Sequence, residues 1–391
     1  MTPVLDLERE YGLVLEGGGA KGAYQIGAWK ALREAGVKIK GVAGTSVGAL
    51  NGALICMGDL QKAENLWRNI SYSKVMDVDD QRMAHLFARD MEPEMRREVL
   101  RDTLHVLVEG GTDITPLRQL IAENVDEEQI RKSSMDFFSC TYSVTDHREL
   151  DVDMKQVPEG QMQDMLLASS YLPVFKNVKL HGKTYMDGGL TNVLPVNTLL
   201  ERGYEDVILL RIFGVGREKR IEIPDHVRIY EIAPRVPLGS VLQFDREKSR
   251  RNMRTGYYDA MRLVYGLEGK IYYIEESREE CYYLKKLLGT ETEILEQILT
   301  RYKLDTEPER QLRSLVEVVL PLIAEELKLS KGWTYRELYL SMLEATARQF
   351  RVPKYEIYTP ESLLACIYRR MGGAELSPEA PDFMRLVLNC G

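Results

Sequence analysis

The sequence has few of the features that mark secreted, membrane-spanning or metal-binding proteins. Its 391 residues include only five cysteines, which are scattered and show neither a metal-site spacing nor a disulfide framework. We expect them to be reduced thiols of a cytoplasmic protein, most of them buried. No run approaches the roughly 18 apolar residues of a spanning helix, and the acidic start of the chain lacks the apolar core of a signal peptide.

An excess of basic residues is also missing. The formal net charge is -8, and because nucleic acids are bound by basic faces, we do not expect a nucleic acid as partner. Neither a calcium loop nor a cluster of histidines and carboxylates is present, so we expect no metal and no cofactor. What the chain does have is length and 44% hydrophobic residues, enough for two or three domains with substantial cores.

The first 55 residues predict a β-α-β-α unit. Residues 11–15 form an apolar run without polar alternation, which is typical of a strand buried on both faces of a parallel sheet. A glycine-rich loop follows, and residues 23–35 have the apolar spacing of a helix. Residues 39–43 predict the next strand, and the small residues after it predict another helix. The fold class is therefore α/β with a mostly parallel sheet.

Ser46 lies where the second strand meets its helix, within Gly44-Thr45-Ser46-Val47-Gly48. A serine in this Gly-x-Ser-x-Gly turn is held in strained backbone geometry with its hydroxyl exposed. Gly44 and Gly48 have no Cβ to obstruct the approach of strand, helix and substrate. The helix N-terminus favours developing negative charge. Taken alone, the pattern also occurs in ordinary strand-to-helix turns.

The loop Gly17-Gly18-Gly19 can be interpreted in two ways. The dinucleotide fingerprint Gly-x-Gly-x-x-Gly is formally present at Gly17, Gly19 and Gly22. The acidic residue expected at the end of the second strand is missing, however, because that strand ends in the Ser46 turn. Lys21 comes too early for a nucleoside triphosphate loop. We favour an oxyanion hole, because acyl transfer from an ester needs N–H donors close to a nucleophilic hydroxyl.

With a third motif, Asp187-Gly188-Gly189, the chain resembles the patatin-like phospholipase family, whose Gly-Gly-Gly-x-Lys/Arg-Gly loop, Gly-x-Ser-x-Gly elbow and Asp-Gly-Gly/Ala stand here in order. The resemblance includes residues 168–175 and covers roughly residues 11 to 270. It implies a three-layer α/β/α patatin-like core in which Ser46 is the nucleophile and Asp187 its partner in a Ser-Asp dyad. The oxyanion hole it implies is Gly17, Gly18 and Gly19. The residues it implies as loop support are Lys21, Gly22, Gly44, Gly48, Gly188 and Gly189.

No histidine is expected to complete a catalytic triad. The five histidines are His85, His105, His147, His181 and His226. Only His226 has the Ser…Asp…His order of the α/β-hydrolases, and it precedes the predicted strand 227–233, whereas a triad histidine follows a strand. Asp187 is therefore expected to take the Ser46 proton itself, and desolvation would raise its pKa and make it a better base.

Between Ser46 and Asp187, residues 75–111 form a charged, methionine-rich insertion. It is compatible with a lid or acyl-chain groove and equally with a pair of surface helices. Residues 135–154 predict a hairpin, and residues 245–265 an amphipathic helix. The row Arg246, Arg250 and Arg254 on that helix is either a solvated face with acidic neighbours or a head-group contact.

From about residue 275 onward, the sequence predicts only helices. Expected N-caps are Thr290, Thr306, Thr334, Thr359 and Ser377, and Pro321 should kink its helix. We therefore expect two domains: a patatin-like acyl hydrolase domain, residues 1–272, and an all-α C-terminal domain, residues 273–391. The second could form a homo-oligomer.

The expected function is hydrolysis of a lipid acyl ester, of the phospholipase A or lysophospholipase type, through an acyl-Ser46 intermediate. The expected partner is a lipid or lysolipid substrate, with peripheral membrane contact. Two alternatives stay open: a general carboxylesterase or thioesterase, and a non-enzymatic lipid-binding scaffold with the same fold. The head group, acyl position and chain length of the substrate have no signature in the sequence.

Overall fold

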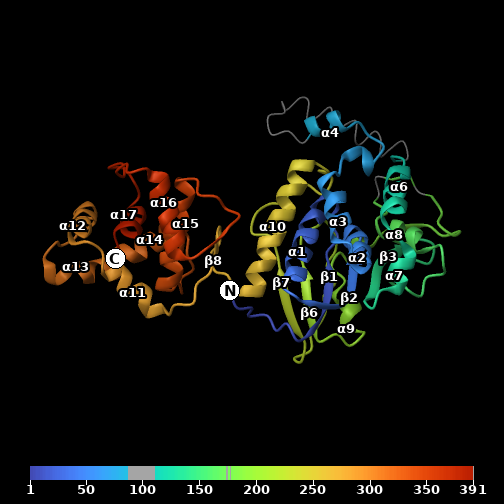
Figure 1. The fold of residues 1–391 in the computed structure, drawn as a ribbon, viewed down its shortest axis with the longest axis horizontal. Helices are drawn as coiled ribbons and strands as arrows, with labels where there is room; N and C mark the ends of the chain where they lie inside the picture. The colour runs from blue at the N-terminus through green and yellow to red at the C-terminus, as the bar shows by residue number, and fades with distance from the viewer. Residues whose placement is uncertain (87–110, 173–174, 177, 391) are drawn as a thin grey trace. The chain divides into compact units, whose positions relative to one another are not determined.

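The computed structural model describes residues 1–86, 111–172, 175–176 and 178–390 (Figure 1). The chain divides into two compact units, one of Thr2–Val264 and one of Tyr265–Gly391 together with Met1. The sequence predicts the boundary between residues 272 and 273, a little further along the chain. No helix in the described part of the chain is long and apolar enough to cross a membrane.

A seven-stranded sheet lies at the centre of the Thr2–Val264 unit as described. Its strands are β1 (Glu10–Leu15), β2 (Lys38–Thr45), β3 (Asp136–Ser143), β4 (Arg148–Asp153), β5 (Tyr185–Asp187), β6 (Asp206–Leu210) and β7 (Arg228–Ile232). The order is β4-β3-β2-β1-β6-β7, and β5 pairs with β3. Only β4 and β5 run antiparallel to their partner. The predicted α/β class with a mostly parallel sheet is confirmed.

Helices cover both faces of this sheet. Phe137 and Val42 face α2 (Val47–Met57), because both side chains lie beside Gly52 of that helix. The next residues along the two strands, Phe138 and Ala43, share a core cluster with Leu199 of α9 (Val196–Leu200). Successive side chains of a strand point to opposite faces, so α2 and α9 lie on opposite sides. The result is the predicted three-layer α/β/α arrangement.

Figure 1 shows the other helices of this unit. They are α1 (Ala23–Glu34), α3 (Leu60–Arg68), α4 (Asp80–Leu86), α6 (Thr115–Asn124), α7 (Glu127–Lys132), α8 (Met162–Ser169) and α10 (Arg246–Tyr265). Helix α3 begins after Asp59, whose side chain accepts the Lys62 N–H and caps the helix. Of the predicted insertion, residues 87–110, including His105, lie outside the described residues.

The C-terminal unit is mainly helical and has its own core. Its elements are β8 (Tyr273–Ile274), α11 (Glu280–Leu288), α12 (Thr292–Arg301), α13 (Pro308–Ser314), α14 (Leu320–Glu326), α15 (Tyr335–Gln349), β9 (Ile357–Tyr358), α16 (Pro360–Met371) and α17 (Asp382–Asn389). The fully buried Tyr283, Leu299 and Leu343 belong to the core. The parallel pair β8–β9 was not predicted, since strands of two residues show no periodicity.

Two of the five expected caps in this unit are confirmed. Thr334 caps α15 and Thr359 caps α16, each accepting a backbone N–H. The other three were wrong, because α12, α13 and α17 begin further along the chain than the predicted caps allow. Near Pro321, a π-helical turn, Leu315–Val319, joins α13 to α14. Proline lacks the N–H that a regular helical ladder needs, which accounts for the irregularity.

Candidate active site

Three neighbouring strands bring Ser46 and Asp187 together. Thr45, the last residue of β2, pairs with Cys140 of β3. The next residue of β3, Thr141, pairs with Asp187 at the end of β5. Ser46 directly follows Thr45, so it lies within about one strand spacing, roughly 5 Å, of the β3 backbone that also holds Asp187. Both side chains are buried.

Ser46 has the strained backbone expected of a nucleophile elbow. Its φ is 56° and its ψ is -125°, a rarely populated conformation for a residue with a side chain. The Ser46 N–H donates to Ser169 Oγ at 2.9 Å, and that hydroxyl donates to the Cys140 carbonyl at 2.6 Å. Ser169 thereby ties the elbow to β3. The sequence offered no signal for this role beyond the Ala-Ser block in which Ser169 stands.

The glycines around the elbow permit close backbone packing. A Cβ on Gly48 would lie 2.2 Å from the Leu15 carbonyl oxygen, and one on Gly44 would lie 2.4 Å from the Gly48 carbonyl. Helix α2 therefore rests directly on β1 and β2, which no larger residue allows. Gly22 and Gly188 are also enclosed, with Val47 and the Cys140 carbonyl too near for a side chain.

Asp187 has one occupied and one unoccupied carboxylate oxygen. Its Oδ1 accepts the Gly189 N–H at 2.7 Å. Its Oδ2 is buried and has no hydrogen-bond partner among the described residues. Burial raises the pKa of Asp187 to about 6, while the nearby Ser46 side chain and the Gly189 N–H act in the opposite direction. Ser46 is thus close enough to affect this pKa although its hydroxyl makes no hydrogen bond of normal geometry to Oδ2.

The glycine loop lies beside the elbow. A Cβ on Gly17 would lie 3.4 Å from the Ser46 Cβ. The Gly17 N–H donates to the Val193 carbonyl at 2.8 Å, so it is already used within the fold. For Gly18 and Gly19, no acceptor of the N–H is found in the part of the chain that the structure describes. These two N–H groups therefore have no partner among the described residues.

Glu16, which the sequence analysis missed, fixes the start of this loop. Its carboxylate is only 2% exposed and accepts the N–H groups of three consecutive residues, Ile212 (2.6 Å), Phe213 (3.0 Å) and Gly214 (3.1 Å). At the other end of the loop, Lys21 Nζ donates to the Phe213 carbonyl at 2.5 Å. The segment after β6 is thus held from both ends of the glycine stretch, by Glu16 at one end and by Lys21 at the other. The position of Glu16 between a buried strand and the glycines could have indicated its role, because a buried carboxylate needs hydrogen-bond partners.

A second buried chain of hydrogen bonds supports the loop from the helices. Trp67 Nε1 donates to Asn51 Oδ1 at 2.9 Å, and Asn51 Nδ2 donates to Gln25 Oε1 at 2.8 Å. Gln25 Nε2 in turn donates to the Glu16 carbonyl at 2.7 Å. Every member is buried, so the chain fixes the loop rigidly. The sequence did not predict this hydrogen-bond chain, because polar residues within a helical pattern are usually exposed.

An apolar cavity of about 70 Å³ opens beside Ser46 and Gly19. Its walls come from α2, α3, α6 and the segment before α10, among them Leu54, Trp67, Leu117 and Phe244. Met76, from the start of the methionine-rich insertion, also lines it. The lining is mostly apolar, and Ser46 is part of it.

Comparison with known proteins shows which family this part of the chain resembles. The family model described as Patatin-like phospholipase matches residues 13–200. Residues 13–200 are a patatin-like phospholipase domain. This stretch contains both Ser46 and Asp187, and the resemblance seen in the three motifs is confirmed.

Curated relatives of the patatin-like domain are much longer proteins. The chain is 30% identical over 204 residues to patatin-like phospholipase domain-containing protein 6 of Homo sapiens, which is 51% of this chain and 13% of that protein. It is 61% identical over 46 residues to Lysophospholipase nte1 of Aspergillus terreus, or 12% of this chain and 3% of that protein. The chain thus spans only a small part of these relatives. Among solved structures, VipD from Legionella pneumophila matches with 15% identity and a TM-score of 0.41, over 97% of this chain and 90% of that chain.

No described histidine of the patatin-like domain or of the segment after it contacts Ser46 or Asp187 through a hydrogen bond or an ion pair. His181 pairs with Asp164 at 2.9 Å, and His226 is exposed in the segment before β7. The arginine row of α10 also lies elsewhere: Arg250 and Arg254 line a cleft of about 630 Å³ that contains Glu34 and Glu64. Acidic neighbours favour the solvated-face interpretation of this row.

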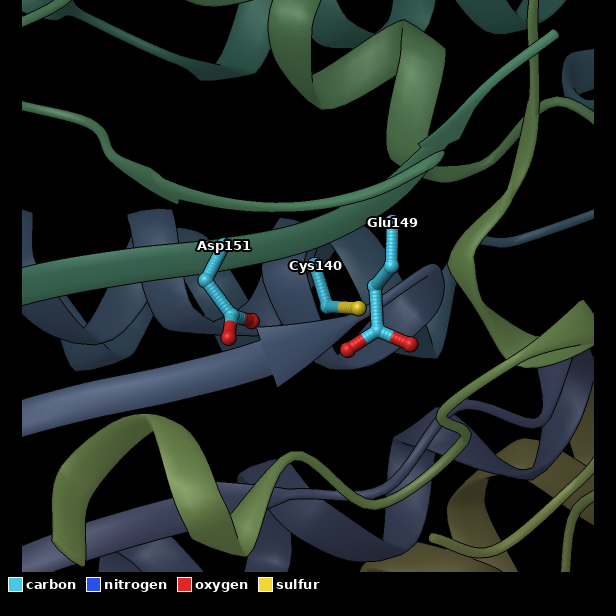
Figure 2. Close-up of side chains that lie close together, drawn as sticks. All are labelled: Cys140, Glu149 and Asp151. Atoms are coloured by element: carbon cyan, nitrogen blue, oxygen red, sulfur yellow. The ribbon is translucent and has the colours of Figure 1, made fainter. Parts of the chain in front are cut away.

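One group of side chains in the patatin-like domain has the composition of a metal site. Cys140 of β3 and Glu149 and Asp151 of β4 place their ligand atoms within 4.8 Å of one another, and Figure 2 shows the two carboxylates on either side of Cys140. Thr198 donates to Asp151 at 2.8 Å, and Lys219 lies 3.4 Å from Glu149. Burial raises the pKa of the Cys140 thiol, which disfavours the thiolate that binds metals. With these polar contacts already made inside the fold, we treat the group as structural.

Proposed function

We propose that this protein hydrolyses acyl esters of lipids, as a phospholipase A or lysophospholipase, with Ser46 and Asp187 as a catalytic dyad. The observation that carries the proposal is the buried pair itself: a strained serine beside a carboxylate whose Oδ2 is unpartnered and whose pKa is raised to about 6. A carboxylate in this state is ready to accept a proton at neutral pH. The patatin-like domain supports lipid esters as the substrate class.

The reaction follows from the positions of these groups. Ser46 Oγ bonds to the ester carbonyl carbon while Asp187 Oδ2 takes the hydroxyl proton. The oxyanion accepts hydrogen bonds from the N–H groups of Gly18 and Gly19. The Gly17 N–H, which was also expected in the oxyanion hole, is not counted because it donates to the Val193 carbonyl. The bond to the lipid alcohol breaks, and that oxygen receives the proton from Asp187. Water then hydrolyses acyl-Ser46 with Asp187 again as the base.

The apolar cavity supports a hydrocarbon acyl group rather than a polar one. Its lining is mostly apolar and includes Ser46. Five free cysteines fit the proposed cytoplasmic location. A homo-oligomer formed through the C-terminal unit stays a prediction.

A labelling experiment tests the proposal. A fluorophosphonate probe should add once to the wild-type protein, as measured by intact-protein mass spectrometry, and not at all to Ser46→Ala. Ser170→Ala, which alters a neighbouring buried serine, is the matched control and should label normally. The same proteins should then be assayed on lysophosphatidylcholine and on a water-soluble ester. Asp187→Asn should be nearly as inactive as Ser46→Ala, whereas His226→Ala should keep most activity.

Three results would count against the proposal. Absence of labelling would support a lipid-binding scaffold. Labelling with turnover of the soluble ester alone would support a general esterase. A His226→Ala variant as inactive as Ser46→Ala, yet folded, would make Asp187 an orienting group.

A further inference from the structure

Three large apolar side chains are exposed close to the glycine loop and Asp187. They are Leu190, Phe213 and Val215, which are 51%, 52% and 79% exposed. Single exposed apolar residues are common on proteins, but several together next to a site mark an interaction surface. We call these three residues the apolar rim.

Backbone contacts place the members of the apolar rim on adjoining loops. Leu190 ends the short turn that follows Asp187, while Phe213 and Val215 belong to the loop after β6. The Arg217 N–H donates to the Gly189 carbonyl at 2.8 Å, and the Val193 N–H donates to the Arg217 carbonyl at 2.8 Å. The two loops therefore run side by side.

The apolar rim stands at the same edge of the sheet as the active site. Strands β1, β2 and β6 are parallel neighbours, so their carboxyl ends lie at one edge. The glycine loop follows β1, Ser46 follows β2, and the loop with Phe213 and Val215 follows β6. Glu16 ties the first of these loops to the third. The apolar rim and Ser46 therefore lie on loops at the same edge of the sheet.

Basic residues follow the rim directly in an otherwise acidic chain. Residues 217–220 read Arg-Glu-Lys-Arg. Glu218 pairs with Arg211 at 2.8 Å and Lys219 with Glu149 at 3.4 Å. Arg217 and Arg220 are exposed and form no side-chain ion pair with any described residue. Guanidinium groups of this kind bind phosphate oxygens well.

We propose that the apolar rim, with Arg217 and Arg220, is the surface by which the enzyme docks on a lipid–water interface that bears phosphate head groups. The inference rests on the proposed lipid hydrolase function. The rim side chains enter the interface, the two arginines meet the phosphates, and Ser46 faces the lipid. Because the net charge of -8 repels a strongly anionic surface, the favoured surface is zwitterionic.

Vesicle binding of an inactive protein tests the docking surface without depending on catalysis. In a Ser46→Ala background, Leu190→Ser/Val215→Ser should lower the fraction that floats with phosphatidylcholine vesicles by about tenfold. Phe213 is left unchanged because its backbone contacts Glu16 and Lys21. The matched control Val4→Ser/Leu312→Ser alters two exposed apolar side chains elsewhere and should float like its parent. Equal flotation of the rim variant, or equal loss in the control, overturns the proposal.

Activity of the protein with Ser46 intact provides the second readout. Leu190→Ser/Val215→Ser should reduce hydrolysis of vesicular phosphatidylcholine by about tenfold and leave hydrolysis of a water-soluble ester within about twofold. Arg217→Gln/Arg220→Gln should cause a smaller loss on vesicles, of about threefold. Unchanged vesicle hydrolysis in the rim variant would refute docking while the hydrolase function stands. If flotation depends on the apolar rim but the wild-type protein hydrolyses no ester, the docking proposal stands and the proposed hydrolase function is refuted.

Discussion

At the scale of single residues, the proposed dyad makes Asp187 the group that sets how hydrolysis depends on pH. A carboxyl group accepts a proton from Ser46 only when it is ionised, and burial raises its pKa to about 6. We therefore expect kcat/KM on a soluble ester to fall about tenfold per pH unit below about pH 6 and to level off above it. A pH–rate profile in wild type and in His226→Ala checks this. An acid limb that moves in His226→Ala would mean that the histidine titrates with the reaction.

The raised pKa of Asp187 also lowers the stability of the folded protein at neutral pH. Because the folded pKa is raised from 3.8 to about 6, the folded state binds the proton more tightly, and the free energy of unfolding falls as pH rises through this window. Above pH 6, the ionised carboxylate destabilises the fold by about 3 kcal/mol. Asp187→Asn should therefore be more stable than wild type at pH 7.5, with the difference shrinking toward pH 4. Urea unfolding at both pH values measures it, and an equal difference at both would contradict the buried-charge account.

Glu16 is the residue through which the glycine loop is positioned. Gln at this site replaces one acceptor oxygen by an NH₂ group that faces backbone N–H donors. We expect Glu16→Gln to lower the free energy of unfolding by about 2 kcal/mol and to lower kcat more than it changes KM, by about ten- to a hundredfold. Glu8→Gln, at an exposed carboxylate, is the matched control and should change neither. A loss of stability with full kcat would make Glu16 purely structural.

At the scale of elements, the crossing of α1 and α10 is set by two glycines. A Cβ on Gly27 would lie 1.8 Å from the Met253 carbonyl oxygen, and one on Gly256 would lie 2.0 Å from that of Tyr24. Gly256→Ala should therefore destabilise the fold by about 1–3 kcal/mol, as overpacking does. Gly332→Ala, which would meet no atom within 4 Å, is the control. Thermal unfolding of both variants tests this, and an equally stable Gly256→Ala would show that the helices can separate at no cost.

The elements also show what can be predicted from sequence. Strand β1, the Ser46 turn and α10 have local signals, namely an apolar run, spaced glycines and an amphipathic period, and all were predicted close to their observed bounds. The sequence around Glu16 and Ser169 does not reveal what these residues bind, because their partners, Ile212 and Cys140, are distant in sequence. The roles of such residues depend on which strands become neighbours. A strand pair as short as β8–β9 cannot be predicted from hydrophobic periodicity, since two residues define no period.

At the scale of the whole molecule, the Thr2–Val264 unit has the properties of an independent folding unit. It holds the sheet, Ser46, Asp187 and the cavity. Its two ends are joined, since the Val4 and Leu5 N–H groups both donate to the Val264 carbonyl. We propose that a chain ending at Val264 unfolds cooperatively and hydrolyses a soluble ester within about threefold of the full protein. Circular dichroism and the ester assay check both points. An unfolded fragment would show that the C-terminal unit is required for folding.

The strand register that joins Thr45, Cys140, Thr141 and Asp187 has a consequence for how this protein can change over generations. Both reactive groups are anchored on a hydrogen-bonded ladder, so their separation does not depend on how much chain lies between them. Insertions or deletions in the covering segments between β2 and β3, such as the methionine-rich stretch, would alter what reaches Ser46 without moving Asp187. If Ser46 and Asp187 act as proposed, new substrates can thus be acquired by lengthening or replacing the covering segments, while the reaction itself is inherited unchanged.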